Sequence, residues 1–453
     1  MAVGRFRLQC LSVVWTVAAA VAQAQNASVP LASALVGEVT FSKGVGFAQT
    51  PGQTPRTLGV GLPLREGDRL TTAVGGSAII RLTDGTRMTL RPQTDLVLAQ
   101  YQYQQDTPGG NMVLDLLQGG FRAITGLISK GSAKAAQVRT PTATIGIRGT
   151  DFDARVCGAD CAADVRQSSE ATRPTNMRAS AKAVGVQGQV SVQAHNGDRR
   201  QVVDGGSVYP GDLVETGSNA GLVLAFRDES RVTLGGGTRF RVDDFVYDHA
   251  QPAEGRFLVS LLKGTVRALT GLIGKARTQN VSFKTPTATL GIRGTGLDLS
   301  CADDGCSFFN WLGSITVTPE GHSALQVLEA GQGLFVSPTG MRPIEQLPLP
   351  HIPRPDGVPV DVGPLFAAAA VGEGQQGLYV FVRDGHIELA TPSGVLHLGR
   401  GEVGLADAGG RLLRPVLMPR FIEFDPTPKP DHPNPLLASI LGESGIRASN
   451  QCR

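Results

Sequence analysis

Aromatic residues, long apolar runs and excess charge are all scarce in this sequence. Phe, Trp and Tyr make up 5% of the 453 residues, and the formal net charge is only +3. Beyond the first 25 residues, no stretch approaches the ~20 apolar residues of a membrane-spanning helix. Charged residues are interspersed without a long run of one sign. We therefore expect no nucleic-acid partner and no transmembrane segment in the mature protein.

Enzyme and metal-binding signatures are also missing. There is no G-x-S-x-G elbow, no G-x-x-x-x-G-K-[ST] phosphate loop, and no Cys with a His at a recognisable catalytic distance. The seven His residues are scattered and never take a paired-ligand spacing. Asp303-Asp304-Gly305 lacks the alternating oxygen ligands of a calcium loop, which favours a solvated turn. We expect no enzyme activity, no cofactor and no metal site, and keep a hydrolase with spatially assembled carboxylates as an alternative.

Glycine and proline, by contrast, are abundant, with 58 and 28 residues. Together with many Val and Thr they favour short strands joined by turns. Ile80 and Leu82 alternate with polar residues, Asp84-Gly85 follows as a turn, and alternation resumes at Met88, a pattern typical of a β-hairpin. The predicted fold class is all-β, built from tandem repeated β-rich domains of short strands and hairpins. Two or three domains suit this length.

The first residues have the organisation of a secretory signal peptide. Arg5 and Arg7 precede an apolar stretch from about Cys10 to Ala22, and Ala22-Gln23-Ala24 fits a small-x-small cleavage site. We predict a signal peptide over residues 1–24 with cleavage after Ala24, and hence a periplasmic or secreted protein. The alternative is an uncleaved membrane anchor, for which the apolar stretch is short.

An eleven-residue string occurs twice, as TPTATIGIRGT (Thr140–Thr150) and TPTATLGIRGT (Thr285–Thr295). The segment LLQGGFRAITGLI from Leu116 returns as LLKGTVRALTGLI from Leu261 with the same offset, 261 − 116 = 145. A constant offset over several segments indicates a duplicated domain. A shorter G-x-I element at Gly313 recurs at Gly385, and indicates a third, partial unit. The predicted organisation is domain 1 over 35–166, a polar linker over 167–182, domain 2 over 183–341, a Pro-rich linker over 342–364, a partial third β unit over 365–415 and a Pro-rich tail over 416–453.

The combined motifs resemble the FecR-type periplasmic domain. They comprise a G-x-V opening at Gly37, an L-x-x-G-D turn ending at Asp68, an L-x-D-G-T hairpin from Leu82, an LL-x-G-x-x-R segment from Leu116 and T-P-T-A-x-x-G-I-R-G-T from Thr140, with counterparts in the second copy. The resemblance implies an all-β extracytoplasmic domain that senses or relays a signal, in founding members from an outer-membrane iron transporter to a sigma factor. This chain has no cytoplasmic region before its apolar segment, so direct contact with a sigma factor across a membrane is not implied.

Two functions fit this resemblance. The first is a non-enzymatic periplasmic sensor, adaptor or ligand-binding module in envelope signalling, with an envelope protein or glycan as partner. The alternative is a structural or interaction protein that binds cell-wall or surface polysaccharide. The sequence identifies neither the ligand nor the partner.

Arg148 and Arg293 are the candidate ligand-binding or partner-binding residues. Each lies in a G-I-R-G-T string whose two glycines suggest a backbone bend. Either arginine could pair with a carboxylate of its own domain, or its guanidinium could receive an acidic ligand. Presence in both copies does not decide between these interpretations.

Five cysteines follow the signal peptide. CGADC (Cys157 and Cys161) and CADDGC (Cys301 and Cys306) stand at equivalent places after each G-I-R-G-T, which favours two short-range disulfides in an oxidising compartment. Zinc held by both pairs, or free thiols, are the alternatives. Cys452 is left over beside the C-terminus.

Overall fold

The computed structural model describes residues 35–105, 109–132, 134–162, 172–175, 179–321, 325–349, 351–372 and 374–443. The predicted signal peptide, Cys452 and half of the polar linker lie outside these ranges. The all-β prediction is confirmed, because almost all regular structure is in two 15-stranded sheets. No helix among the described residues is long and apolar enough to cross a membrane.

The strands divide cleanly between the two sheets. The first sheet contains β1 (Leu35–Lys43), β2 (Gly46–Gln49), β3 (Arg56–Thr57), β4 (Pro63–Arg65), β5 (Arg69–Thr72), β6 (Ser77–Leu82), β7 (Arg87–Leu90), β8 (Asp95–Gln102), β9 (Asn111–Ile124), β10 (Ala136–Arg139), β11 (Thr144–Cys157), β27 (Gly377–Thr391), β28 (Gly394–Gly399), β29 (Val403–Asp407) and β30 (Leu412–Leu413). The second contains β12 (Ala181–Gln187), β13 (Val190–Gln193), β14 (Arg199–Gln201), β15 (Ser207–Val208), β16 (Leu213–Thr216), β17 (Gly221–Phe226), β18 (Arg231–Leu234), β19 (Arg239–Val246), β20 (Arg256–Leu269), β21 (Val281–Lys284), β22 (Ala288–Ala302), β23 (Gly305–Pro319), β24 (Gln326–Glu329), β25 (Gly333–Ser337) and β26 (Gly340–Ile344).

Helical segments are short and lie between or after the strands. They are η1 (Ile128–Lys130), η2 (Pro252–Glu254), α2 (Leu272–Ala276), η3 (Thr278–Asn280), η4 (Pro355–Gly357), α3 (Val362–Phe366), α4 (Arg420–Glu423) and α5 (Pro435–Glu443).

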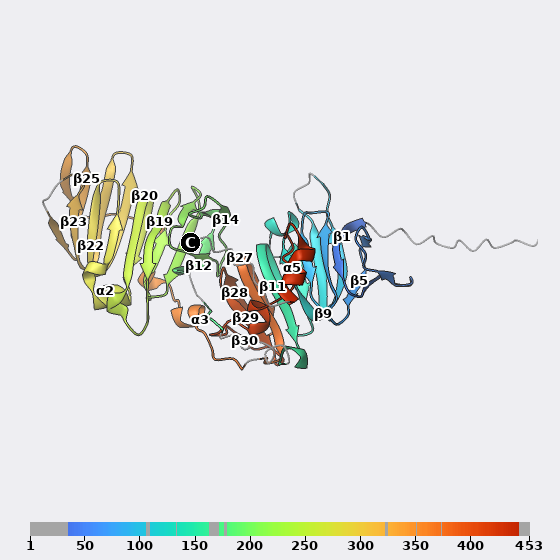
Figure 1. The fold of residues 1–453 in the computed structure, drawn as a ribbon. Coiled ribbons are helices and arrows are strands. Elements are labelled where there is room, and N and C mark those ends of the chain that lie inside the picture. The colour runs from blue at the N-terminus through green and yellow to red at the C-terminus, as the bar shows by residue number, and fades with distance from the viewer. Residues whose placement is uncertain are drawn as a thin grey trace, which may run out of the picture.

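The C-terminal strands complete the first sheet. Strand β27 pairs with β11 from Thr144↔Ala390 to Cys157↔Gly377, just as β23 pairs with β22 in the second sheet. Residues 365–415, expected as a third unit, therefore supply β27–β30 to domain 1 and form no sheet of their own. In Figure 1 these strands lie between the rest of domain 1 and domain 2.

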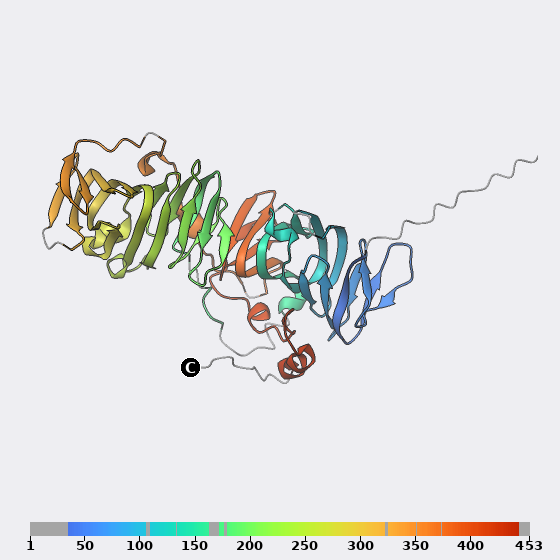
Figure 2. The ribbon, with the colours of Figure 1, turned by 90° about the horizontal axis from the view of Figure 1, so that it is seen from above.

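Domain 2 is thus inserted into domain 1. The chain leaves domain 1 after β11, builds the second sheet from Ala181 to Ile344, and returns at β27. The points of departure and return are adjacent, because a Cβ placed on Gly374 would lie 2.8 Å from the Cα of Ala162. The two domains lie end to end in an elongated molecule (Figure 2).

The duplicated G-I-R-G-T string marks a bend in a long strand. From Thr144 to Gly146, β11 pairs with β10, whereas from Asp151 to Val156 it pairs with β9. The change of partner falls at Gly149, whose φ of +53° is one that glycine adopts without steric cost, and Gly294 repeats it with a φ of +61°. The string occurs twice because each domain has one long strand that bends here and changes its pairing partner.

Each domain buries its own apolar core. Ile145 and Leu290, the one difference between the two strings, are both fully buried, in the cores of domain 1 and domain 2 respectively. The core of domain 1 also includes Val380 and Leu389 of β27, so the returning strands are part of its hydrophobic interior. At roughly 25 cal/mol per Å² of apolar area, burial of such strands is a main source of the domain's stability.

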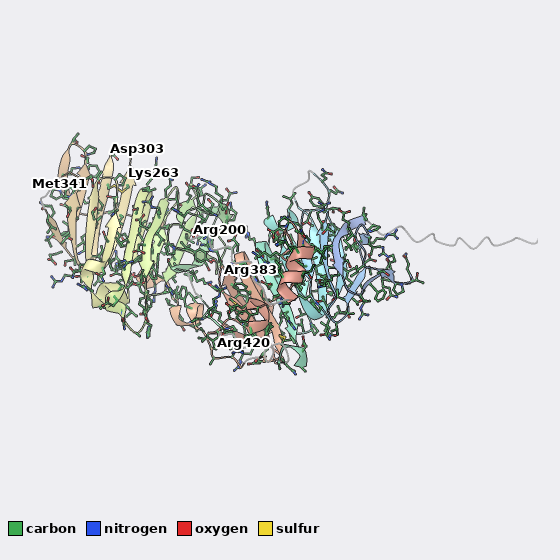
Figure 3. The ribbon with its side chains drawn as sticks, viewed as in Figure 1. Arg200, Lys263, Asp303, Met341, Arg383 and Arg420 are labelled. Atoms are coloured by element: carbon green, nitrogen blue, oxygen red, sulfur yellow. A yellow bond between two sulfur atoms is a disulfide. The ribbon has the colours of Figure 1, made fainter. Side chains whose placement is uncertain are left out.

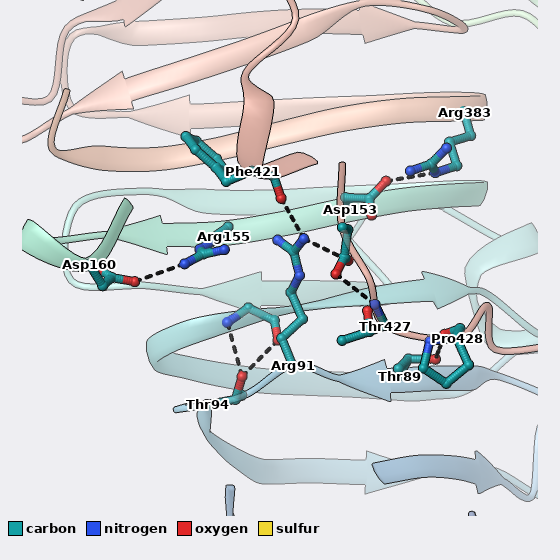
Figure 4. A network of polar contacts seen from close by, with 12 residues as sticks. Thr89, Arg91, Thr94, Asp153, Arg155, Asp160, Arg383, Phe421, Thr427 and Pro428 are labelled. Atoms are coloured by element: carbon teal, nitrogen blue, oxygen red, sulfur yellow. Dashed lines mark hydrogen bonds and ion pairs between the residues drawn. The ribbon is translucent and has the colours of Figure 1, made fainter. Parts of the chain in front are cut away.

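Proline-rich segments cover one face of each domain. In domain 1, Thr89 donates from Oγ1 to the carbonyl of Pro428 at 2.8 Å, and Arg91 pairs with Asp425 at 2.6 Å (Figure 4). In domain 2, Arg267 Nη1 donates to the carbonyl of Ile352 at 2.9 Å. Proline-rich segments do not form regular backbone hydrogen-bond ladders, because proline has no N–H to donate. Their carbonyls can therefore accept hydrogen bonds from arginine side chains.

Candidate functional site

The strongest candidate site is the junction of the two domains, where the bend of β11 faces the β13–β14 hairpin. Arg148, Gly149, Gly385 and His386 come from domain 1, and Arg200 comes from domain 2. Figure 3 shows Arg200 on the side of domain 2 that faces domain 1. Together these elements enclose a cavity of about 400 Å³.

Four cationic side chains line this cavity: Lys130, Arg148, Arg199 and Arg200. Its remaining lining residues are Gly149, Ser191, Gln201, Gly385 and His386, so no carboxylate is among them. Positive charge concentrated in a recess raises the local concentration of anions. The cavity is chemically suited to a carboxylate or phosphate group.

Two of the four cations have acidic partners outside the cavity lining. Arg200 pairs with Asp212, and Arg199 pairs with Glu215 at 2.8 Å. Arg200 also lies over the ring of Tyr209, with 5.4 Å from its guanidinium carbon to the ring centroid. These contacts hold the two side chains of domain 2 in place.

The other two cations are unpaired. Across the described ranges, the side chains of Lys130 and Arg148 have no hydrogen bond or ion pair. Arg148 is half-buried and Lys130 is exposed. A half-buried guanidinium without a carboxylate retains its full donor capacity for a ligand.

Arg293 occupies the same place in domain 2 but lines none of the cavities described here. It is exposed, and its backbone N–H donates to Thr295 Oγ1 at 3.0 Å. The difference comes from the order of the domains. The bend of β11 faces domain 2, whereas among the residues that the structure describes no other domain faces the bend of β22. Of the two predicted arginines, the structure therefore places only Arg148 in a cavity between the domains.

A larger cavity of about 580 Å³ also lies between the domains. Its lining mixes charges, with Arg227 and Arg414 beside Glu229, Asp248 and Glu402. Its three carboxylates and two guanidinium groups largely offset one another. We therefore rank it below the basic cavity as a ligand site.

A buried polar network joins the domains beside the basic cavity. Lys182 of β12 donates to Ser207 Oγ at 2.8 Å and pairs with Glu402 at 2.7 Å. Arg414 lies 3.5 Å from the other oxygen of Glu402 and donates to the carbonyl of His397. Burial is the largest influence on the pKa of Lys182 and lowers it.

His386, Glu388 and His397 form a second cluster at the same junction. His386 and Glu388 stand two residues apart on β27, and pairing with β28 brings His397 opposite Glu388. His386 Nε2 lies 3.3 Å from His397 Nδ1. Burial, then the neighbouring His397 and cations, lowers the pKa of His386 to about 3, and burial also lowers the pKa of His397. Both imidazoles are neutral near pH 7.

Linear spacing could not reveal this cluster. The two histidines are 11 positions apart in the sequence, and only the hairpin register of β27 with β28 makes them neighbours. The linker predicted over 167–182 includes Lys182, whereas this residue lies on the first strand of domain 2. The detectable signal was the G-x-I element at Gly385, which belongs to domain 1 and carries His386 directly after its glycine.

Both cysteine pairs form disulfides, but they occupy different positions. Cys301 lies opposite Gly264, whereas Val156, not Cys157, lies opposite the equivalent Gly119. A shift of one residue turns a side chain to the other face of a strand. The expected equivalence was therefore wrong by one residue: Cys301 belongs to the core of domain 2, and Cys157 to an outer cluster beneath the C-terminal segment.

The FecR protein family model matches residues 68–169 and 212–314. One matched region lies in each domain, so each domain is similar to the FecR family over that region. Two crystal structures of a candidate anti-sigma factor from Parabacteroides distasonis ATCC 8503, at 1.65 and 2.50 Å resolution, are similar to 30% of this chain and 59% of their own, with 16% identity and a TM-score of 0.24. No curated protein sequence matches this chain significantly.

Proposed function

We propose that this tandem FecR-domain protein is a non-enzymatic sensor or adaptor of envelope signalling that binds an anionic ligand at the junction of its domains. The family match and the two disulfides support a role outside the cytoplasm, in the periplasm or after secretion. The observation that carries the ligand proposal is the unpaired Arg148 guanidinium in a cavity without carboxylates.

The position of the cavity suits a sensor. Its walls come from both domains, so a ligand that contacts Arg148 and Arg200 together binds best when the domains hold their present arrangement. A ligand shifts a conformational equilibrium by its difference in affinity for the two states. A partner that contacts both domains can thereby respond to whether the ligand is bound.

The alternative is a structural protein that binds cell-wall or surface polysaccharide. An acidic glycan would use the same cations, whereas a neutral glycan would not need them. The two functions therefore differ in the ligand and in the response of the domains, and one set of variants can test both.

The test compares Arg148→Gln with Arg293→Gln, which is matched because ten of eleven surrounding residues are identical. Binding of inorganic phosphate, an aspartate-rich peptide and an oligouronate is measured by calorimetry, with a neutral oligosaccharide as reference. We expect Arg148→Gln to weaken binding of an anionic probe at least tenfold and Arg293→Gln to leave it unchanged.

Three outcomes decide the proposal. Binding of phosphate or peptide that depends on Arg148 supports the sensor, particularly if small-angle scattering changes on binding. Arg148-dependent binding of the oligouronate alone, without a change in scattering, favours the structural alternative. Equal losses in both variants, or binding of none of the anions, would contradict the site.

A further inference from the structure

We propose that His386, Glu388 and His397 form a three-ligand site for a divalent transition metal, for which Zn²⁺ is the reference ion. The cluster lies at the domain junction on β27 and β28. One ligand atom from each residue lies within 4.8 Å of the others. Imidazole nitrogens and a carboxylate oxygen are the ligand types of three-residue zinc sites.

The separation of the two nitrogens fits a shared metal. Zinc binds histidine nitrogen at about 2.0–2.1 Å, and a tetrahedral angle then places two such nitrogens about 3.3–3.4 Å apart. His386 Nε2 and His397 Nδ1 are 3.3 Å apart. This separation is long for a hydrogen bond between nitrogens, since N–H donors in proteins usually lie about 2.9–3.0 Å from their acceptors.

The three side chains also lack other roles. Within the described part of the chain, the carboxylate of Glu388 has no hydrogen bond or ion pair. His386 is 9% exposed, and its Nδ1 is buried without a partner. Buried polar groups are ordinarily satisfied. The contact with His397 therefore leaves one ring nitrogen of His386 without a hydrogen-bond partner among the described residues.

Domain 2 shows that the fold does not require these residues. In domain 1, Thr150 Oγ1 donates to the carbonyl of His386, and in domain 2 the equivalent Thr295 Oγ1 donates to the carbonyl of Ser314. Ser314 therefore stands where His386 stands in domain 1. By the same register, Thr316 and Val327 stand where Glu388 and His397 stand. The potential ligands occur only in the copy whose hairpin faces the other domain.

A bound metal would join β27 to β28 at the surface that packs against domain 2. The ring of His397 packs so closely on Gly205 that a Cβ there would lie 2.1 Å from its Cγ. Lys182, Arg148 and Arg200 lie near His386, and their charges oppose a second cation. We therefore expect weaker binding than at a closed four-ligand structural site, with the remaining coordination position open to water or an anion.

The test uses the whole purified chain, stripped of metal with a chelator and carrying Cys10→Ser and Cys452→Ser so that these thiols cannot contribute. Zn²⁺ is titrated calorimetrically, and the loaded protein is studied by X-ray absorption. We expect one ion per chain, with two imidazole nitrogens in its first shell, and a rise in melting temperature because the ion binds the folded state.

The decisive variants are Glu388→Gln, which is isosteric and half-buried, and His397→Gln. Each should weaken Zn²⁺ binding at least tenfold, while His351→Gln, at an exposed histidine elsewhere, should not. Circular dichroism checks that each variant is folded. Absence of stoichiometric binding, or unchanged affinity in folded Glu388→Gln and His397→Gln, would overturn the proposal. Arg148→Gln should retain zinc, so failure of this site is distinguishable from failure of the anion cavity.

Discussion

Lys182 Nζ lies 2.7 Å from Glu402 Oε1, and this pair connects the first strand of domain 2 to the turn between β28 and β29 of domain 1. Their side chains are 1% and 2% exposed. Such a buried pair fixes the relative position of two surfaces, because separation would leave Lys182 without its carboxylate partner and Glu402 with Arg414 alone. It is a fully buried polar link between the domains.

Removing one member of this pair should be costly. Lys182→Met leaves the Glu402 carboxylate buried beside only Arg414, and loss of one partner of a buried ion pair costs about 3–5 kcal/mol. The free energy of unfolding, measured with urea, should fall accordingly. A Lys182→Met, Glu402→Leu, Arg414→Met triple variant should recover much of the loss, since it leaves no buried charge of this network without a partner.

The exposed pair Arg81–Glu38 provides the control. Arg81→Met should change stability by less than about 1 kcal/mol, as exposed ion pairs generally do. A similar small effect for Lys182→Met would contradict the structural role assigned to the buried pair.

The inserted arrangement predicts which fragments fold. Residues 179–349 should fold alone as a β domain, whereas 35–162 should not, because β11 loses its partner β27. Joining 35–162 to 374–443 through a short Gly-Ser linker should restore the first domain, since Ala162 and Gly374 are adjacent. Circular dichroism and amide dispersion in NMR spectra distinguish these outcomes. A stable, dispersed fragment 35–162 would show that the C-terminal strands are dispensable.

The two disulfides should contribute locally. They span sequence separations of 4 and 5 residues, and the loss of unfolded-state entropy, about 3 kcal/mol for a 15-residue loop, is smaller for shorter ones. We expect Cys157→Ser with Cys161→Ser to lower stability by about 1–3 kcal/mol while the domain still folds. Denaturation of the paired variants measures this, and global unfolding at room temperature would be inconsistent with a local role.

Alkaline pH should destabilise the region beneath the C-terminal segment. Burial raises the pKa of Tyr379 to about 12, and its ring packs against Phe421 at a centroid distance of 5.0 Å. Because the folded pKa exceeds the unfolded value of about 10, this contribution is complete below pH 10 and is lost as pH rises toward 12. Tyr379→Phe should flatten the fall in stability between pH 10 and 12, measured by urea unfolding. An unchanged slope would mean that this phenol does not control it.

Much of the fold was readable from residue patterns. The alternation around Ile80 and Met88 identified strands β6 and β7, and the constant offset identified two copies of one domain. The cysteine spacings identified both disulfides, because residues four or five apart at the end of a strand can meet in a turn. These are local relationships, which depend on the chain within a few residues.

Long-range relationships were harder to predict. The hydrophobic alternation of β27 suits either a separate unit or the open edge of domain 1, and periodicity alone cannot choose between them. One sequence difference does point to the pairing. In copy two, the strand that pairs with β22 follows it directly as β23, whereas in copy one the G-x-I element of the equivalent strand comes only at Gly385. The Arg148 cavity and the His386 cluster depend on that pairing, so they could not be located without it.

The nested order of the strands also fixes a sequence of events during synthesis. β11 ends at Cys157, but β27 begins only at Gly377, so 377 − 157 = 220 further positions must be made before the edge of β11 can be covered. Domain 2 can fold during that interval, while the edge of β11 in domain 1 remains without its partner strand β27. Such edges recruit other chains. The protein's period of greatest risk of aggregation therefore falls between the emergence of residue 157 and that of residue 391.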